Sequence, residues 1–339
     1  MMRRILLLSV FCMLGVDAIQ SFAAAPEFHI AEQTILPGAV KWDYLSFDSD
    51  AKRLFITHGD QVDIYDPTRK NVTNSIKGTS GVHGVALASA LGKGFTTNGR
   101  ANTVTVFDLK TLKILATLAT EDKPDAISYD PYTQRVFVAN GGSGSLTVID
   151  AKTNLVLGTV VIGGRLEFAV VDGKGHLFIN VEDQNAVAVV DTVALTLVAR
   201  YDLASVCGEP AALAIDTLSD RLFVGCGNKK MVTVDAKTGA ILADVGIGKG
   251  CDAVAFDSQL KLLFSSNGEG TLTVISTENY AVIQTLKTKL TARTLALDEG
   301  SHRLYTVAAD ILETRGEGNR PTLKPGSFTL LTIERSVAH

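Results

Sequence analysis

The sequence predicts an all-β fold: a seven-bladed β-propeller of four-stranded antiparallel blades. Three observations lead to it. A short motif with an aromatic first residue recurs seven times along the 339 residues, about 40–45 residues apart. Each copy lies in a repeat with several short apolar runs separated by turn residues. The first repeat is also preceded by one extra segment of strand character. A repeat of roughly 40–45 residues built from short strands is typical of a propeller blade.

The repeat at residues 123–163 shows the four strands most clearly. Apolar runs at 126–129 and 136–139 are separated by an Asp-Pro turn, and a Gly-rich turn leads to an alternating strand at 146–150. A fourth run covers 155–162. The motif ends each second strand, and its seven copies begin at Phe55, Phe95, Phe137, Phe178, Phe223, Phe264 and Tyr305.

Aspartate ends most first and third strands. We expect its carboxylate to cap the following turn by accepting backbone N–H groups. First strands end at Asp48, Asp130, Asp172, Asp216, Asp257 and Asp298, with Ala88 in the second repeat. Third strands end at Asp66, Asp108, Asp150, Asp191 and Asp235, and then at Ser276.

The two ends of the chain complete one blade. The last repeat ends at 327–332 without a fourth strand, whereas 28–36 resembles a fourth strand without the first three. Pairing of these segments would close the ring and remove an exposed sheet edge. We therefore expect the propeller to span 26–339, with blades at about 41–78, 79–120, 121–163, 164–204, 205–248, 249–287 and 288–335 plus strand 28–36.

The recurring tetrapeptide resembles the YVTN β-propeller repeat, whose namesake residues end the second strand. Phe137-Val-Ala-Asn140 is a clear copy, and Phe replaces Tyr in six of the seven. The resemblance covers about 28–335. It implies an extracytoplasmic seven-bladed propeller and no single activity, since fold does not determine function. Relatives with this repeat look like binding scaffolds or surface proteins, and one branch resembles single-stranded DNA binders.

Residues 1–25 read as a cleaved signal peptide. A basic start at Arg3-Arg4 precedes an apolar stretch at 5–16 and three alanines at 23–25. That stretch is too short to span a membrane, and Cys12 lacks the surroundings of a lipoprotein cleavage site. We expect a periplasmic or secreted protein without a membrane anchor. A closed ring leaves no edge to cover, so we expect a monomer.

The composition of the chain argues against one class of partner. The formal net charge is −4 at pH 7 and there is one Trp. This argues against a nucleic-acid partner, since nucleic-acid-binding grooves are basic and aromatic-lined.

Three cysteines follow the predicted leader. Cys207 precedes a first strand and Cys226 ends the second strand of the same blade, on one face, so we expect them to form a disulfide. The alternative is three buried free thiols, with Cys251 as the third.

The residue just before each first strand should lie at one mouth of the central channel. These seven positions, called the mouth ring below, are Asp43, His83, Asp125, Glu167, Ala211, Asp252 and Arg293. Six are ionisable, although Asp, Glu, Lys and Arg make up only 20% of the chain. Crowded carboxylates raise one another's pKa or attract a cation. The six ionisable residues are the predicted ligand-binding set.

His58 ends the second strand of the first blade on the same face. With His83, Asp43 and Asp125 it could supply two imidazoles and two carboxylates to one divalent metal ion. The alternatives are that these side chains bond to loop backbone and channel water, or that they perform acid–base chemistry without a metal.

Three functions remain open at this point. The leading one is a non-catalytic scaffold that binds a small molecule, polymer or protein at the mouth, because no complete catalytic motif is present. The second is a metal-assisted hydrolase, lactonase or lyase in which Arg293 orients an anionic substrate. Single-stranded DNA binding is the third, and the negative charge counts against it.

The seventh repeat contains an insertion at 310–326 on the mouth face. We expect either a loop that covers the mouth or contacts a partner, or a loop without regular structure.

Overall fold

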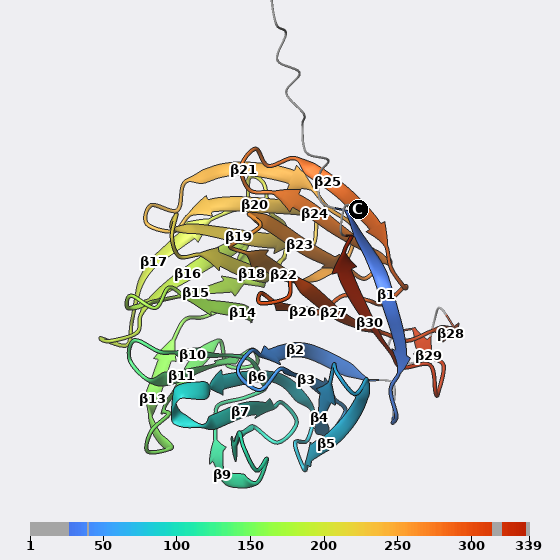
Figure 1. Ribbon diagram of the computed structural model, residues 1–339. Helices are drawn as coiled ribbons and strands as arrows, with labels where there is room; N and C mark the ends of the chain where they lie inside the picture. The colour runs from blue at the N-terminus through green and yellow to red at the C-terminus, as the bar shows by residue number, and fades with distance from the viewer. Residues whose placement is uncertain (1–26, 39–40, 314–320, 337–339) are drawn as a thin grey trace, which may run out of the picture.

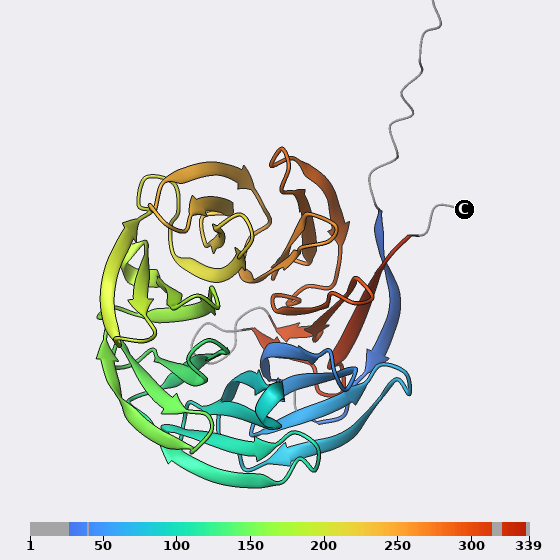
Figure 2. The same cartoon turned by 60° about the vertical axis from the view of Figure 1, so that its left-hand side comes forward.

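The fold is a closed ring of seven four-stranded antiparallel sheets. It is seen in a computed structural model that describes residues 27–38, 41–313 and 321–336. The predicted leader at 1–25 lies outside these residues. Figures 1 and 2 show the sheets arranged as blades around a common axis, with the chain passing from blade to blade in sequence order. The predicted fold class is confirmed.

Each of the first six blades contains four consecutive strands. Their order is first to fourth from the axis outward. Blades one to three contain β2 (Trp42–Asp48), β3 (Arg53–His58), β4 (Gln61–Asp66), β5 (Asn71–Lys77), β6 (Val82–Ala88), β7 (Lys93–Asn98), β8 (Thr103–Asp108), β9 (Ile114–Ala119), β10 (Pro124–Asp130), β11 (Arg135–Asn140), β12 (Ser145–Asp150) and β13 (Leu155–Val161).

Blades four to six repeat the same arrangement, and two short 3₁₀ helices lie in turns. The strands are β14 (Leu166–Val171), β15 (His176–Val181), β16 (Ala186–Asp191), β17 (Thr196–Asp202), β18 (Pro210–Asp216), β19 (Arg221–Cys226), β20 (Lys230–Asp235), β21 (Ile241–Gly246), β22 (Cys251–Asp257), β23 (Leu262–Asn267), β24 (Thr271–Ser276) and β25 (Val282–Lys287). The helices are η1 (Ser89–Leu91) and η2 (Glu182–Gln184).

The seventh blade is built from both ends of the chain, as the sequence predicted. Its order is β26 (Leu295–Asp298), β27 (Arg303–Ala308), β30 (Thr329–Arg335) and β1 (Phe28–Ile35). The antiparallel pairing of β1 with β30 runs along the whole of β1, and both views show the two strands side by side (Figures 1 and 2). This pairing gives β30 the partner that it would otherwise lack.

The insertion in the seventh repeat contains more structure than expected. Its two described ends form a small antiparallel sheet of β28 (Ile311–Glu313) and β29 (Thr322–Leu323). Lys289 forms an ion pair with Asp310 at 2.9 Å, which ties the start of the insertion to the preceding loop. Residues 314–320 lie outside the described part.

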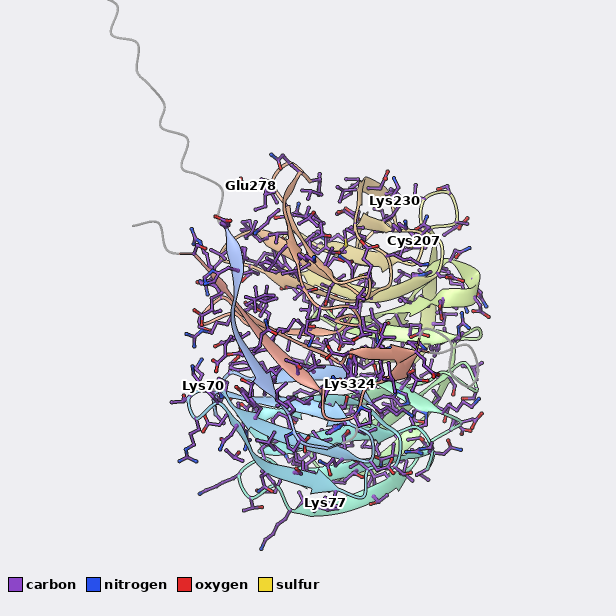
Figure 3. The ribbon with its side chains drawn as sticks, turned by 90° about the vertical axis from the view of Figure 1, so that its right-hand side faces the viewer. Lys70, Lys77, Cys207, Lys230, Glu278 and Lys324 are labelled. Carbon is purple, nitrogen blue, oxygen red and sulfur yellow. A yellow bond between two sulfur atoms is a disulfide. The ribbon has the colours of Figure 1, made fainter. Side chains whose placement is uncertain are left out.

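The apolar core lies between the blades. Second and third strands are buried on both faces, and the motif aromatics Phe55, Phe95, Phe137, Phe223, Phe264 and Tyr305 are at most 1% exposed. Fourth strands are half-exposed and alternate toward solvent. Lysines on or beside them, such as Lys70 and Lys77, extend outward at the edge of the first blade (Figure 3). Burying both blade faces is what makes ring closure necessary.

The aspartates at strand ends cap turns, as predicted. Asp48 accepts the backbone N–H groups of Asp50 and Ala51 at 3.2 and 3.1 Å, and Asp191 accepts those of Val193 and Ala194, each at 2.8 Å. Such bonds to the ionised form lower a carboxyl pKa. The backbone bonds lower the pKa of Asp191 accordingly. These charges therefore have a structural role.

Among the described residues, no helix is long and apolar enough to cross a membrane.

Candidate functional site

A β-bulge places the mouth ring. In each of the first six blades the pairing of first and second strands shifts register at the ring position, for example between Pro124 and Ile127 around Asp125. A bulge leaves one residue unpaired and turns its side chain. Six of the seven ring residues thus lie at the second position of the first strand, and not just before the strand as the sequence suggested, while Arg293 precedes β26. The side-chain type at this position differs from blade to blade.

Hydrogen bonds between blades hold the ring backbone in place. Thr97 donates its hydroxyl to the Asp125 carbonyl at 2.6 Å, and Thr294 donates to the Asp43 carbonyl at 3.0 Å. Each bond joins one blade to the ring residue of the next. The ring is therefore preorganised by the scaffold and does not depend on flexible loops.

His83, Asp43 and Asp125 form the centre of the ring. The Nδ1 atom of His83 lies 2.5 Å from Asp43 Oδ2 and 3.6 Å from Asp125 Oδ1. Gly99 makes room for the imidazole, since a Cβ at this glycine would lie 2.7 Å from the His83 ring. Burial alone would lower the pKa of His83, but the hydrogen bond to Asp43 and the two carboxylate charges outweigh it and raise that pKa.

Asp125 is the least satisfied carboxylate of the ring. Its Oδ1 oxygen is buried and accepts no hydrogen bond from the described residues, although 27% of the side chain is exposed. Burial raises its pKa to about 7, against the attraction of His83, and the Asp43 and Asp252 charges add to the rise. Asp125 therefore titrates near neutrality and lacks a donor.

Arg293 and Asp252 form the second charged pair of the ring. Arg293 Nε lies 2.7 Å from Asp252 Oδ2, and the contact is an ion pair without hydrogen-bond geometry. Burial raises the pKa of Asp252 to about 6 in spite of the arginine. The Arg293 side chain is 44% exposed, so its charge is partly screened by solvent.

Glu167 faces a carboxyl group that the sequence reasoning missed. Burial first, then the Asp125 charge and a hydrogen bond with Glu182, raise the pKa of Glu167 to about 9. With this pKa, Glu167 is protonated at neutral pH and can donate a hydrogen bond to Glu182. Glu182 also pairs with Arg165 at 2.5 Å.

A repeat comparison could have found Glu182. In five of the seven repeats the residue after the tetrapeptide is glycine, and in the fourth repeat it is Glu182. Glu182 follows the tetrapeptide directly, outside the two repeat positions from which the site was predicted.

An aromatic pair closes the channel below the ring. Tyr44 of the first blade and Phe168 of the fourth meet edge to face at 5.1 Å between centroids. These blades are not neighbours, so the contact crosses the axis. Burial first, and then the charges of the ring carboxylates, raise the pKa of Tyr44 well above its usual value. The ring side chains therefore lie beside an aromatic contact that joins opposite blades.

His58 lies apart from the His83 cluster. Its Nδ1 hydrogen bonds Asp63 Oδ2 at 2.8 Å within the first blade, and its ring packs on Phe328 at 4.6 Å. The corresponding Asn140 likewise bonds third-strand side chains, Ser145 and Thr147. His58 thus takes the structural place of the motif asparagine. Of the four predicted metal ligands, the structure brings Asp43, His83 and Asp125 together, with ligand atoms within 4.8 Å of one another.

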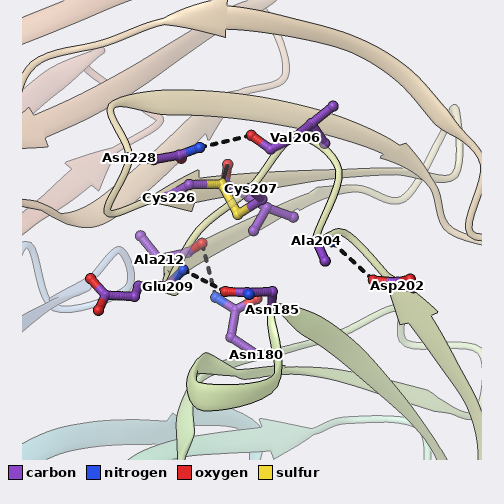
Figure 4. Close-up of a disulfide and its surroundings, with 11 residues drawn as sticks. Asn180, Asn185, Asp202, Ala204, Val206, Cys207, Glu209, Ala212, Cys226 and Asn228 are labelled. Carbon is purple, nitrogen blue, oxygen red and sulfur yellow. Dashed lines mark hydrogen bonds between the residues drawn. A yellow bond between two sulfur atoms is a disulfide. The ribbon is translucent and has the colours of Figure 1, made fainter.

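Ala211 leaves the fifth blade without a charged ring residue, and this blade carries the disulfide instead. Cys207 and Cys226 are joined, with Cα atoms 5.4 Å apart. Figure 4 shows the bridge beside the Asn228 bond to the Val206 carbonyl. The bridge ties the loop before β18 to the end of β19.

Comparison of the sequence with protein-family models and with curated proteins found no match. The functional interpretation therefore depends on the geometry of the mouth.

Proposed function

We propose that the protein is an exported β-propeller of the YVTN-repeat type that acts as a binding scaffold, with the mouth ring as its ligand site. The observation that carries this proposal is the crowding of the ring residues Asp43, Asp125, Glu167 and Asp252 around one axis, where His83 and Arg293 are the ring residues that can carry positive charge. Propellers commonly use the axial mouth of the ring in this way. The sequence features of residues 1–25 support export.

The ligand that fits this ring carries positive charge. Asp125 Oδ1 is buried without a donor, and the pKa values of Asp125 and Glu167 are raised to about 7 and about 9. A raised carboxyl pKa means that negative charge is poorly compensated in the free site. A bound cation would compensate it and release protons from these groups. The aromatic pair of Tyr44 and Phe168 would contact the organic part of such a ligand.

A matched pair of probes tests this proposal. Calorimetric titration with 1,4-diaminobutane and with the neutral 1,4-butanediol should show saturable binding of the diamine only. An Asp125→Asn, Glu167→Gln variant should lose at least tenfold in affinity. An exposed Glu278→Gln variant, changed at the periphery of the sixth blade (Figure 3), should bind as the wild type does. Failure of every cationic probe, calcium, manganese and zinc included, would refute a cation site.

A second candidate function is metal-assisted hydrolysis or elimination, favoured by the Asp43, His83 and Asp125 cluster. One imidazole and two carboxylates are a donor set that suits a divalent transition metal. These residues would hold the ion, which would activate a bound water molecule. About one equivalent of metal in the purified protein, lost in His83→Ala, would favour this function over simple binding. A metal-free protein that takes up no zinc or manganese would exclude it.

A further inference from the structure

On the face opposite the mouth ring, a basic side chain joins neighbouring blades at a repeated position. It is the first residue of the second strand, and it donates to the carbonyl that follows the third strand of the next blade. Arg53 donates to Leu109 at 2.6 Å, Lys93 to Ala151 at 3.0 Å, Arg135 to Thr192 at 2.5 Å and Arg221 to Thr277 at 3.0 Å.

The guanidinium groups also cover aromatic rings. Arg53 lies over Phe55 at 5.1 Å and Arg221 over Phe223 at 5.7 Å from the ring centroid. Each of these two arginines also binds the aspartate that ends its own first strand. The repeat thus builds a guanidinium position from an aromatic face, a carboxylate and a carbonyl of the next blade.

The fourth blade has this position without the guanidinium. His176 stands there, and its imidazole bonds Asp172 at 2.9 Å without an observed bond to the fifth blade. The carbonyl of Ala236 is reached instead by the Tyr201 hydroxyl at 2.8 Å. Fourth strands of other blades carry aliphatic residues where Tyr201 stands, namely Ile76, Leu118, Val160, Val245 and Leu286.

The remaining interfaces are closed in other ways. Leu262 takes the position in the sixth blade and is 4% exposed within the core. Arg303 of the seventh blade binds Glu334 at 2.8 Å. Only the fourth blade, among the described residues, combines a short polar residue at this position with a tyrosine that meets the neighbouring carbonyl.

A pocket of about 430 Å³ opens at this interface, a volume in the range of small-ligand sites. Phe178, Tyr201, Val198 and Ile215 form the apolar wall. The acceptors are the Ala236 carbonyl and Asp172, whose carboxylate already accepts hydrogen bonds from Lys174 and His176. The His176 and Phe178 ring centroids lie 6.4 Å apart. A carbonyl oxygen has two lone pairs, so Ala236 can accept a second donor beside Tyr201.

We propose that this pocket receives an arginine side chain of a partner protein. The guanidinium would occupy the position that Arg53, Arg135 and Arg221 fill elsewhere, with its plane on the Phe178 and Tyr201 rings and its aliphatic stem along Val198. Asp172 and the Ala236 carbonyl would accept its N–H groups. This site lies away from the mouth ring and does not depend on the function proposed for it.

Two lysines lie at the rim of the pocket. Lys174 and Lys237 both pair with Asp220, at 3.1 and 2.5 Å. Their charges are paired with this carboxylate at the exposed edge of the pocket. An acidic side chain would have to compete with Asp220 for them, whereas a guanidinium finds acceptors inside the pocket.

Titration with N-acetylarginine methylamide, followed by NMR shifts or calorimetry, tests the proposal on the full-length protein. We expect a dissociation constant on the order of 1 mM for this single side chain. The citrulline analogue, which has the same shape without the charge, should bind at least tenfold more weakly. His176→Arg fills the pocket from within and should abolish binding, while His29→Arg, exposed and distant, adds the same group without effect.

The Tyr201→Phe variant tests whether a change in arginine binding comes from the pocket itself or from loss of folding. It keeps the aromatic wall and releases the Ala236 carbonyl, so binding of the arginine probe should be unchanged or tighter. Several results would overturn the proposal: no saturable binding to the wild type, equal binding of citrulline or norleucine analogues, preference for a glutamate analogue, or unaltered binding in His176→Arg.

Discussion

Glu167 shows how one residue can link the mouth to pH. Its carboxyl is protonated at neutral pH because burial, Asp125 and the hydrogen bond with Glu182 raise its pKa to about 9. A carboxyl whose folded-state pKa exceeds its unfolded-state value binds more protons in the folded protein between the two values. It favours folding fully below the unfolded-state value, and this contribution is lost as the pH rises through about 9.

The first prediction follows from this loss of stability as the pH rises. Glu167→Gln keeps a neutral donor toward Glu182 and removes the titration. The variant should be more stable than the wild type at pH 8 by about 1–3 kcal/mol, and this difference should shrink toward pH 5. Urea denaturation at both pH values measures it. Glu278→Gln, on the exposed surface, should show neither effect. A pH-independent difference between Glu167→Gln and wild type would contradict the buried protonated carboxyl.

A second residue-scale prediction concerns the buried pair of His58 and Asp63. Asp63 is 1% exposed and also accepts hydrogen bonds from Gln61 and Ser75, each at 2.6 Å. Asp63→Ala removes the acceptor of these hydrogen bonds and leaves the buried donors without a partner. It should lower the free energy of unfolding by about 3–5 kcal/mol. His58→Asn, which introduces the motif residue, should cost less, about 1–2 kcal/mol.

Thermal and urea unfolding of both variants measure this contrast. Asp244→Ala, which breaks the exposed pair with Lys230, is the control and should change stability by less than about 1 kcal/mol. Equal small effects for Asp63→Ala and Asp244→Ala would show that the buried pair does not hold the first blade together.

At the scale of elements, the disulfide fastens the loop that enters the fifth blade. Cys207 and Cys226 are 19 positions apart, and a bridge of this span stabilises a protein by about 3 kcal/mol through the unfolded chain. A Cys207→Ser, Cys226→Ser variant should be less stable by this amount, and its midpoint should not respond to reductant. The wild-type midpoint should fall to the same value on reduction.

Thiol labelling gives the complementary result. Burial raises the pKa of Cys251 to about 12, so this thiol should stay unreactive until the protein unfolds. Labelling of Cys207 and Cys226 in the unreduced, unfolded protein would contradict the bridge.

Closure of the ring depends on β1. Phe28 is 1% exposed, packs edge to face on Phe264 at 5.0 Å, and exchanges two 2.8 Å hydrogen bonds with the Gln284 side chain. Phe28→Ala should therefore lower the free energy of unfolding by about 3–5 kcal/mol. Ile35→Ala, in the same strand but 64% exposed, should change it by less than about 0.5 kcal/mol. Similar small effects for both would mean that β1 docks without closing the ring.

The elements were more predictable than the site. Strand order, closure by residues 28–36 and the capping aspartates could be predicted because each repeats, and repetition averages out local ambiguity. The mouth ring positions followed from the same frame. The hydrogen-bond partner of His58 could not be predicted. Whether this side chain turns toward its own third strand or toward the next blade depends on the packing around Phe328. Glu182 was missed although the repeat marked it as an exception.

For the whole molecule, the ring presents two chemically different faces. One face has the charged mouth ring above the Tyr44 and Phe168 contact, and the other has the aromatic pocket between the fourth and fifth blades. The mouth ring arises from one position whose side chain differs from repeat to repeat, and the pocket arises where the fourth repeat departs from the common pattern. A scaffold whose blades are otherwise alike can therefore bind different partners on opposite faces.

The most direct test of the mouth as a cation site is the number of protons released on binding. Calorimetry with 1,4-diaminobutane at pH 7, in two buffers with different heats of ionisation, gives this number. We expect release of about one proton from Asp125 and Glu167 as the cation compensates their charge, and none from the Asp125→Asn, Glu167→Gln variant. The opposite result would be that the diamine binds without proton release and that the double variant still binds it. This would place the ligand elsewhere and contradict the proposed role of the mouth ring.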